Sequence, residues 1–137
     1  MTIKIKKDIY DTLIDHAKQE LPIESCGYLA GTDQLITTFY PMTNIDKSHE
    51  HFTFDPKEQF QVVKKARNDK LSILSVYHSH PSSPARLSKE DIRLFNDPNM
   101  IYIIVSLKEE TPDIKAYTLK KEGPDNITIN AVPIEKV

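Results

Sequence analysis

The chain has 137 residues, a length at which one domain with its own hydrophobic core is the usual outcome. Hydrophobic residues make up 39% and charged residues 28% of the chain, which is typical of globular proteins and excludes a disordered or fibrous class. The net charge is -2 and no basic patch stands out, so composition gives no reason to expect a nucleic-acid partner. We therefore expect a single domain over residues 1–137.

The number of cysteines and the hydropathy of the chain indicate its cellular compartment. A single cysteine, Cys26, excludes an intramolecular disulfide and fits a reducing compartment. The N-terminal segment carries charges and has no apolar run of signal-peptide length. No segment approaches the roughly 20 apolar residues that a membrane-spanning helix needs. We expect a cytoplasmic protein without a membrane partner, and no pattern indicates its oligomeric state.

The first helix pattern lies close to the N-terminus. Over residues 8–20, apolar residues recur four apart, at Ile9, Leu13 and Ala17, which predicts an amphipathic helix with Asp8 as its N-cap. Before it, residues 3–5 alternate apolar and charged side chains and predict a short edge strand.

A hairpin is expected next. Residues 25–31 form a short apolar run that ends in a glycine and predicts a buried strand. Residues 33–40 are rich in β-branched and aromatic side chains, so they are expected to pair with that strand.

A second helix is expected over residues 54–67. Asp55 is a suitable N-cap, Pro56 suits the first helical position, and Glu58 stands where a capping box places its acid. Phe60 and Val63 would supply the apolar face of this helix.

The remaining patterns are strands with one short helix among them. Residues 71–77 read as a strand, 88–97 as a short helix, and 100–107 as the most hydrophobic run and a central strand. Residues 113–120 and 126–134 read as two further strands with a turn signal between them. The patterns therefore predict a mixed β-sheet flanked by helices, of the α/β or the α+β class.

The segment YHSHPSSPARLSKED, residues 77–91, has two interpretations. In the structural one, Pro81 ends a strand, and Ser88 and Asp91 form a capping box for the next helix. In the functional one, His78 and His80 point to the same side of a strand because strand side chains alternate with a period of two.

A metal site would need a third ligand besides these two histidines. Asp91 follows His80 after a loop of ten residues, which is long enough for it to fold back toward the strand end. Two imidazoles and one carboxylate suit Zn²⁺ and leave one coordination position for a water whose pKa the metal lowers to about 7. Asp91 could cap its helix with one carboxylate oxygen and bind the metal with the other.

Such a water needs a base, and no HExxH motif supplies one nearby. Glu24, beside the buried strand 25–31, is the best candidate, because an acid there is unusual unless it faces a site. An exposed residue at the strand end is an equally good interpretation of Glu24 from the pattern alone.

The combination resembles the JAMM (MPN-plus) metalloprotease motif, an upstream Glu followed by H-S-H-P, six residues, Ser, two residues and Asp. Every position matches, at Glu24, His78, Ser79, His80, Pro81, Ser88 and Asp91. The likeness covers nearly the whole chain and is greatest to the small prokaryotic members, with ESCGYLAG and the FDP-initiated helix where the family has them.

The resemblance implies a fold and a role for each motif residue. The fold would be a cytidine-deaminase-like α/β core. His78, His80 and Asp91 would bind Zn²⁺, and Glu24 would act as general base and then general acid. Ser88 would donate a hydrogen bond to the oxyanion.

The resemblance also implies a substrate, a small ubiquitin-like or sulfur-carrier protein with a C-terminal Gly-Gly. A metallopeptidase would cleave the peptide or isopeptide bond after that Gly-Gly. The alternatives are an isopeptidase that removes ubiquitin-like proteins from lysines, and a non-catalytic MPN scaffold. A scaffold typically loses motif residues, and this sequence keeps all of them.

Three further residues deserve a prediction. His49 and His51 form a second H-x-H in a polar loop without a following S-x-x-D, so we expect exposed loop histidines, with a place near the substrate groove as the alternative. Cys26 is expected to be a small buried core residue rather than a nucleophile or a soft metal ligand.

Overall fold

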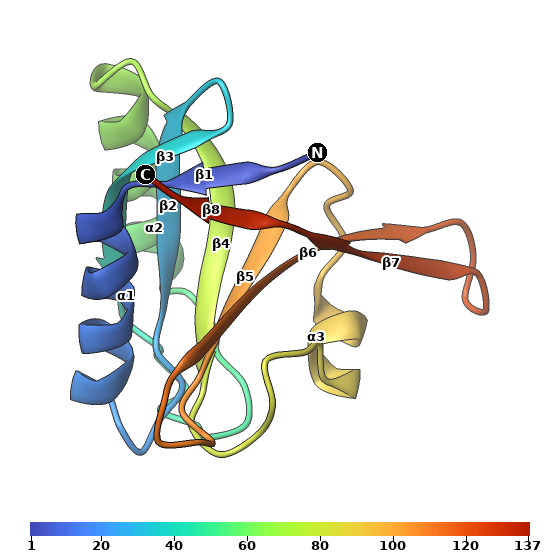
Figure 1. Cartoon of the computed structure of the whole chain (residues 1–137). Coiled ribbons are helices and arrows are strands. Elements are labelled where there is room, and N and C mark those ends of the chain that lie inside the picture. The colour runs from blue at the N-terminus through green and yellow to red at the C-terminus, as the bar shows by residue number, and fades with distance from the viewer.

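The computed structural model describes residues 1–137 and contains one mixed β-sheet (Figure 1). In chain order the strands are β1 (Ile3–Ile5), β2 (Cys26–Thr32), β3 (Leu35–Met42), β4 (Ser72–His80), β5 (Ile101–Ser106), β6 (Asp113–Lys121), β7 (Ile127–Val132) and β8 (Ile134–Lys136). Their order across the sheet is β7-β6-β5-β4-β2-β3-β1-β8. A mixed sheet of this kind confirms the predicted α/β class.

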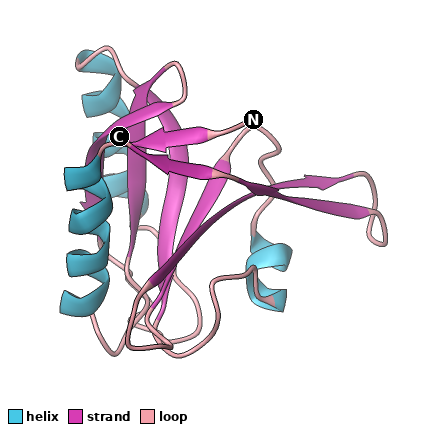
Figure 2. Ribbon diagram, in the orientation of Figure 1, coloured by secondary structure: helices cyan, strands magenta, loops and turns pink.

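Helices cover both faces of the sheet (Figure 2). Helix α1 (Lys7–Gln19) places Leu13 and Ala17 in one hydrophobic core, together with side chains from β1, β2 and β5. Helices α2 (Pro56–Asn68) and α3 (Lys89–Leu94) lie on the other face, where Ala66 and Phe95 join a second core. The sheet is therefore the middle layer of three.

Strand β4 occupies the centre and carries the two motif histidines. It pairs antiparallel with β2 and parallel with β5, whose residues are all buried. The predicted strand over 71–77 thus continues through His80, because pairing on both sides satisfies the backbone up to that residue. The β2–β3 hairpin predicted from the sequence is also confirmed.

The prediction of an edge strand at residues 3–5 is wrong. Strand β1 lies between β3 and β8, and pairs with both in parallel. Strand β8 supplies the edge, and it follows β7 after Pro133 although β7 lies at the opposite edge of the sheet. Ile3 and Ile5 are fully buried because β8 and α1 cover them.

The start of α1 also differs from the prediction. The N-cap is Lys6, whose side chain makes no capping hydrogen bond, and Asp8 lies inside the first turn. There its carboxylate accepts from the backbone N–H of Ile9 at 3.0 Å. An acid in the first turn still interacts favourably with the positive end of the helix dipole.

Helix α2 begins as predicted but buries a different face. Asp55 is its N-cap and accepts from the Lys57 N–H, with Pro56 at the first position. The predicted capping box is absent, since the Glu58 carboxylate accepts from Thr43 instead.

The apolar face predicted for α2 is wrong as well. The side chain of Phe60 is 71% exposed and that of Val63 is 36% exposed. Ala66 and the partly buried Val62 pack against the sheet instead. The helix is rotated relative to the prediction because the face with the smaller side chains meets the sheet.

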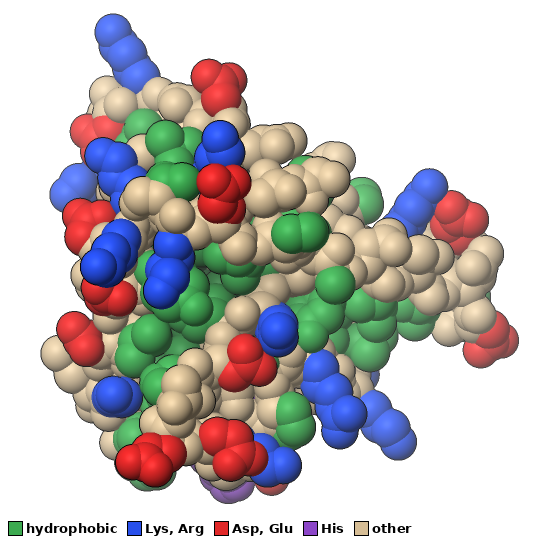
Figure 3. All heavy atoms as spheres, in the orientation of Figure 1, with side chains coloured by type: hydrophobic (Ala, Val, Ile, Leu, Met, Phe, Trp, Pro, Cys, Tyr) green, Lys and Arg blue, Asp and Glu red, His purple; other side chains and the backbone are tan.

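Helices α1, α2 and α3 all lack the length and hydropathy of a membrane-spanning helix. On the face shown in Figure 3, acidic and basic side chains are interspersed rather than gathered by sign.

Candidate metal centre and catalytic site

His78 and His80 are the last two residues of β4 whose side chains lie on the face of the sheet that α2 and α3 cover. Both are buried, at 0% and 2% exposed. The intervening Ser79 and the preceding Tyr77 point to the opposite face, as the strand period requires. The strand therefore aims two imidazoles at one point, as the sequence predicted.

Asp91 is brought to the same point by the start of α3. Ser88 is the N-cap of this helix, and its Oγ accepts from the Asp91 N–H at 3.0 Å. In return, Asp91 Oδ2 accepts from the Ser88 N–H at 3.0 Å, which completes a capping box. The box fixes Asp91 with its carboxylate directed at the end of β4.

Three donor atoms converge there. Nε2 of His78 lies 3.1 Å from Nε2 of His80 and 3.2 Å from Oδ2 of Asp91, and the His80–Asp91 distance is 3.0 Å. The same Oδ2 atom thus serves the cap and the cluster, which corrects the expectation that the two carboxylate oxygens divide these tasks. The capping box and the metal cluster are parts of one arrangement and do not exclude each other.

The spacing of the cluster fits Zn²⁺. Ligands placed tetrahedrally at about 2.0–2.1 Å from an ion lie about 3.3 Å apart, close to the 3.0–3.2 Å separations of these three atoms. The three residues are the buried His/Asp group of the chain that could hold a metal ion. Two nitrogens and one oxygen are a donor set that zinc accepts.

The surroundings of the histidines fix the tautomer of His80 and the ring orientation of His78. His80 Nδ1 lies 2.8 Å from the Pro84 carbonyl oxygen, which can only accept, so Nδ1 carries the proton and Nε2 keeps its lone pair. His78 Nδ1 has no hydrogen-bond partner. The ring of His78 is instead oriented by Phe52, stacked on it at 5.0 Å, and by Phe95, edge-on at 5.5 Å.

The ionisation of the cluster is also set by its environment. Burial lowers the pKa of His78 and favours the neutral imidazole that binds a metal. Burial raises the pKa of Asp91, but hydrogen bonds with His78 and His80 and from the Ser88 N–H outweigh it. The net pKa is therefore well below the ordinary range. The carboxylate is thus ionised, as ligation requires.

Glu24 is buried, at 3% exposed, so the interpretation as an exposed strand-end residue is wrong. One carboxylate oxygen, Oε1, has no hydrogen-bond partner. Burial raises the pKa of Glu24 to about 9, and the nearby carboxylates of Asp91 and Glu50 add to the shift. A buried acid with an unpartnered oxygen is a common feature of catalytic sites.

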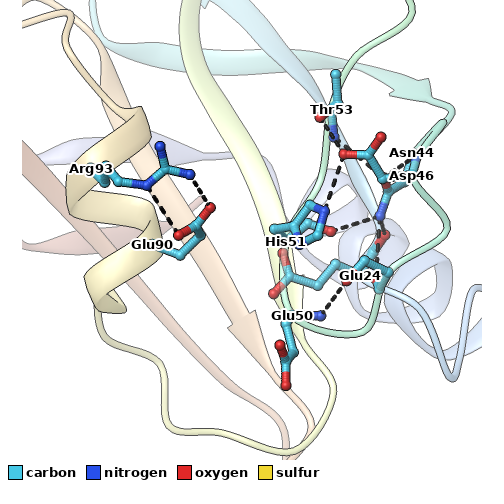
Figure 4. A network of polar contacts seen from close by, with 9 residues as sticks. Glu24, Asn44, Asp46, Glu50, His51, Thr53, Glu90 and Arg93 are labelled. Carbon is cyan, nitrogen blue, oxygen red and sulfur yellow. Dashed lines mark hydrogen bonds and ion pairs between the residues drawn. The ribbon is translucent and has the colours of Figure 1, made fainter.

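A cavity of about 450 Å³ joins this acid to two other motif residues, His80 and Ser88. Glu24, just before β2, lies on one side of it together with Glu50 from the loop after β3, and α3 with Glu90 lies across from them (Figure 4). All lining residues are polar, as suits a site that admits water and a peptide bond.

The loop that supports Glu24 contains a residue that sequence reasoning missed. Asn44 Nδ2 donates to the backbone carbonyls of Glu24 at 3.0 Å and His51 at 3.0 Å, and Ser48 O accepts from the Glu24 N–H at 2.8 Å (Figure 4). Nothing in the loop sequence distinguished Asn44, because its partners are backbone atoms distant in the chain.

The second H-x-H does not form a metal cluster. The His51 imidazole lies 3.2 Å from the Asp46 carboxylate, and the His49 side chain is 69% exposed. His49 is exposed as predicted, and it also lines the cavity beside Glu24, so a place near a substrate stays a prediction. Cys26 is a buried core residue as predicted, and burial raises the pKa of its thiol to about 12, which keeps it protonated and unreactive.

Comparisons with known proteins agree with this geometry. The family of prokaryotic homologs of the JAB domain matches residues 6–120. The chain is 27% identical over 131 residues to the CysO-cysteine peptidase of Mycobacterium tuberculosis, covering 93% of this chain and 90% of that protein. It is 27% identical over 101 residues to the desampylase of Pyrococcus furiosus, covering 74% and 70% of the two chains.

Solved structures share the fold. Protein DSY2949 from Desulfitobacterium hafniense is 37% identical, with a TM-score of 0.84 over 99% of this chain and 94% of that one. The JAB1/MPN domain protein AF2198 from Archaeoglobus fulgidus is 23% identical, with a TM-score of 0.66 over 99% and 98%. The chain belongs to the family of prokaryotic homologs of the JAB domain and is a metallopeptidase of the JAMM type, whose His78–His80–Asp91 group fits a Zn²⁺ site.

Proposed function

We propose that this chain hydrolyses the peptide or isopeptide bond after the C-terminal Gly-Gly of a small ubiquitin-like or sulfur-carrier protein. The observation that carries the proposal is the buried His78–His80–Asp91 cluster, which shares a polar cavity with Glu24, an acid that has an unpartnered oxygen. The names of two relatives, a CysO-cysteine peptidase and a desampylase, support the substrate class.

His78, His80 and Asp91 hold the zinc ion in this proposal. When bound, Zn²⁺ supplies Lewis acidity at the scissile carbonyl and lowers the pKa of coordinated water to about 7. The protein fixes its three ligands through the β4 strand, the Pro84 carbonyl and the Ser88 capping box. Such supporting contacts typically contribute about 10–100-fold to metal affinity or activity.

Glu24 transfers the proton. Its carboxylate accepts a proton from the attacking water and then donates it to the leaving amine. In the metal-free protein its pKa is raised to about 9, and a nearby cation would lower that value toward neutral pH. A pKa near neutral pH suits a group that must both accept and donate a proton in one cycle.

Ser88 stabilises the oxyanion. Its Oγ accepts from the Asp91 N–H in the capping box, so the hydroxyl proton remains available for a second hydrogen bond. Ser88 lines the same cavity as Glu24 and His80. A donor at this position acts on charge that develops in the transition state, where such a bond has the largest effect on rate.

A Gly-Gly sequence suits this site for a steric reason. Two residues without a Cβ can pass through a narrow channel beside a buried metal cluster, where larger residues would be excluded. We also propose that residues 1–137 act as one catalytic domain, since β1 and β8 from the two ends of the chain pair with each other.

The test is cleavage by the zinc-loaded protein of a ubiquitin-like carrier with an extension after its Gly-Gly. We expect the wild type to release the extension and Glu24→Ala to retain zinc but not turn over. A carrier with Ala-Ala in place of Gly-Gly should resist cleavage. Absence of cleavage of every Gly-Gly substrate by protein with one zinc per chain would refute the proposal.

The isopeptidase alternative differs only in the leaving amine. The name of one relative, a desampylase, and that of another, a probable TtuB-protein conjugate cleaving protease of Thermus thermophilus, favour it. Parallel measurement of kcat/KM on a linear Gly-Gly fusion and on the same carrier linked to a lysine distinguishes the two. A scaffold would show neither cleavage nor a bound zinc that depends on His78.

A further inference from the structure

A set of buried polar side chains lies behind the metal cluster, on the opposite face of β4. Ser79 stands between His78 and His80 in sequence, but its side chain points to the other face of the sheet. Ser79 is 0% exposed and Ser25, the residue after Glu24, is 1% exposed. The proton-transfer acid and the metal-binding strand therefore meet at two buried serines.

Two hydrogen bonds join these serines. The Ser25 N–H donates to Ser79 Oγ at 2.8 Å, and the Ser79 N–H donates to the Ser25 carbonyl at 3.0 Å. The regular β2–β4 register reaches Cys26 and His78, so these bonds extend the pairing one step further, with a hydroxyl in place of a carbonyl acceptor. The N–H concerned belongs to the Glu24–Ser25 peptide unit, so its orientation sets that of Glu24.

The Ser25 side chain is held by a third element. Its hydroxyl is hydrogen-bonded to the hydroxyl of Tyr77, which is fully buried. The Tyr77 hydroxyl in turn lies 3.1 Å from Nδ1 of His16 on α1. The serine pair is thus supported by the helix that covers this face of the sheet.

The backbone of Glu24 is fixed from the front as well. Its N–H donates to the Ser48 carbonyl at 2.8 Å and its carbonyl accepts from Asn44 at 3.0 Å. The carboxylate oxygen Oε1 has no partner of its own. The position of the Glu24 carboxylate in the cavity is therefore set by the hydrogen bonds of the backbone before and after it, because the carboxylate itself makes none.

We propose that the Ser79 hydroxyl is a positioning residue for Glu24, with Ser25 and Tyr77 as its support. It ties the Glu24 backbone to the strand that carries the metal ligands, so the acid and the cluster keep one fixed separation. The inference rests on the proposed function, because it assigns Glu24 the proton transfer. It goes beyond that function because it assigns Ser79, the middle residue of H-S-H, a separate role in positioning Glu24.

The first experiment compares Ser79→Ala with Ser79→Thr and with Tyr40→Phe. Tyr40 is a buried control whose hydroxyl bonds to Asp69, away from the site. We expect Ser79→Ala to lose about 10–100-fold in kcat, as supporting contacts typically do, with KM and zinc content unchanged. Ser79→Thr keeps the hydroxyl and should restore kcat, and Tyr40→Phe should retain it.

The second experiment does not depend on activity. Amide hydrogen exchange in the wild type should show the Ser25 N–H protected, and Ser79→Ala should speed its exchange about tenfold or more while Ser79→Thr does not. The ¹³C resonance of the Glu24 carboxyl should shift in Ser79→Ala alone. If no variant or wild type cleaves the substrates, the proposed function fails and these two measurements still decide the positioning role.

Two results would overturn the inference. One is a Ser79→Ala variant with wild-type kcat and an unshifted Glu24 resonance. The other is a loss of kcat that Tyr40→Phe shares or that a loss of zinc accounts for, since either would assign the effect to general stability or to the metal ligands.

Discussion

Glu24 shows at the scale of one residue how a buried acid reduces stability. Its carboxyl group is buried with one oxygen unpartnered, and burial raises its pKa to about 9 from an ordinary value of 4.5. Between these pH values the folded, metal-free protein binds one more proton than the unfolded chain. Its free energy of unfolding therefore falls as pH rises from about 4.5 to about 9.

Glu24→Gln is expected to remove this pH dependence. An amide of the same shape carries no charge, so the metal-free variant should gain on the wild type by up to about 1.4 kcal/mol for each pH unit between these values and be the more stable of the two at pH 8. Urea unfolding between pH 5 and pH 9 at about one-unit steps measures the slope. Glu122→Gln, whose side chain is 53% exposed in the wild type and lies away from Glu24, is the matched control and should keep the wild-type slope. Parallel profiles for wild type and Glu24→Gln would contradict the argument.

Helix α3 illustrates at the scale of one element that a structural motif and a functional one can share atoms. The capping box that starts this helix aims Asp91 at the histidines, and one oxygen of Asp91 serves both. The helix has only six residues, so its cap contributes a large share of the total stability of the helix. Cap and cluster therefore share one carboxylate oxygen of Asp91.

Ser88→Ala is expected to have two separable effects. Loss of the cap should cost about 1 kcal/mol of unfolding free energy. Loss of the oxyanion donor should lower kcat by about 10²–10³. Asp55→Ala removes the equivalent cap of α2 and provides the comparison, because it should cost a similar free energy and leave kcat unchanged. Wild-type kcat in both variants would leave Ser88 with the capping role alone.

At the scale of the whole molecule, the proposed zinc site joins parts of the chain that are far apart. Its proposed ligands come from β4 and α3, and Glu24 beside them lies just before β2. Because the unfolded chain does not assemble this site, the free energy of zinc binding adds to that of folding.

Zinc is therefore expected to raise the thermal stability of the protein. At a free zinc concentration of about 1,000 times Kd the gain is about 4 kcal/mol, which a shift of Tm reports. His78→Ala should abolish the shift. His49→Ala, in the exposed second H-x-H, should retain it. An equal response of both variants to zinc would mean that the metal binds elsewhere.

The local patterns of the sequence predicted the local parts of this molecule. The strand period directed His78 and His80 to one side, and S-x-x-D predicted the capping box, because each depends on residues within one turn or one strand. The patterns failed where a distant segment decided the outcome. Phe60 is exposed because of how α2 lies on the sheet, and β1 is internal because β8 returns to cover it.

The sequence by itself determined the identities and spacing of the proposed metal ligands, the cap that presents Asp91, and the family to which the chain belongs. Only the tertiary structure decided that Glu24 is buried in the same cavity, that Asn44 and Ser79 hold its backbone, and that one oxygen of Asp91 serves two tasks. The physical reason is that helix caps and strand alternation are properties of neighbouring residues, whereas burial and the partners of a buried group depend on segments that only folding brings together.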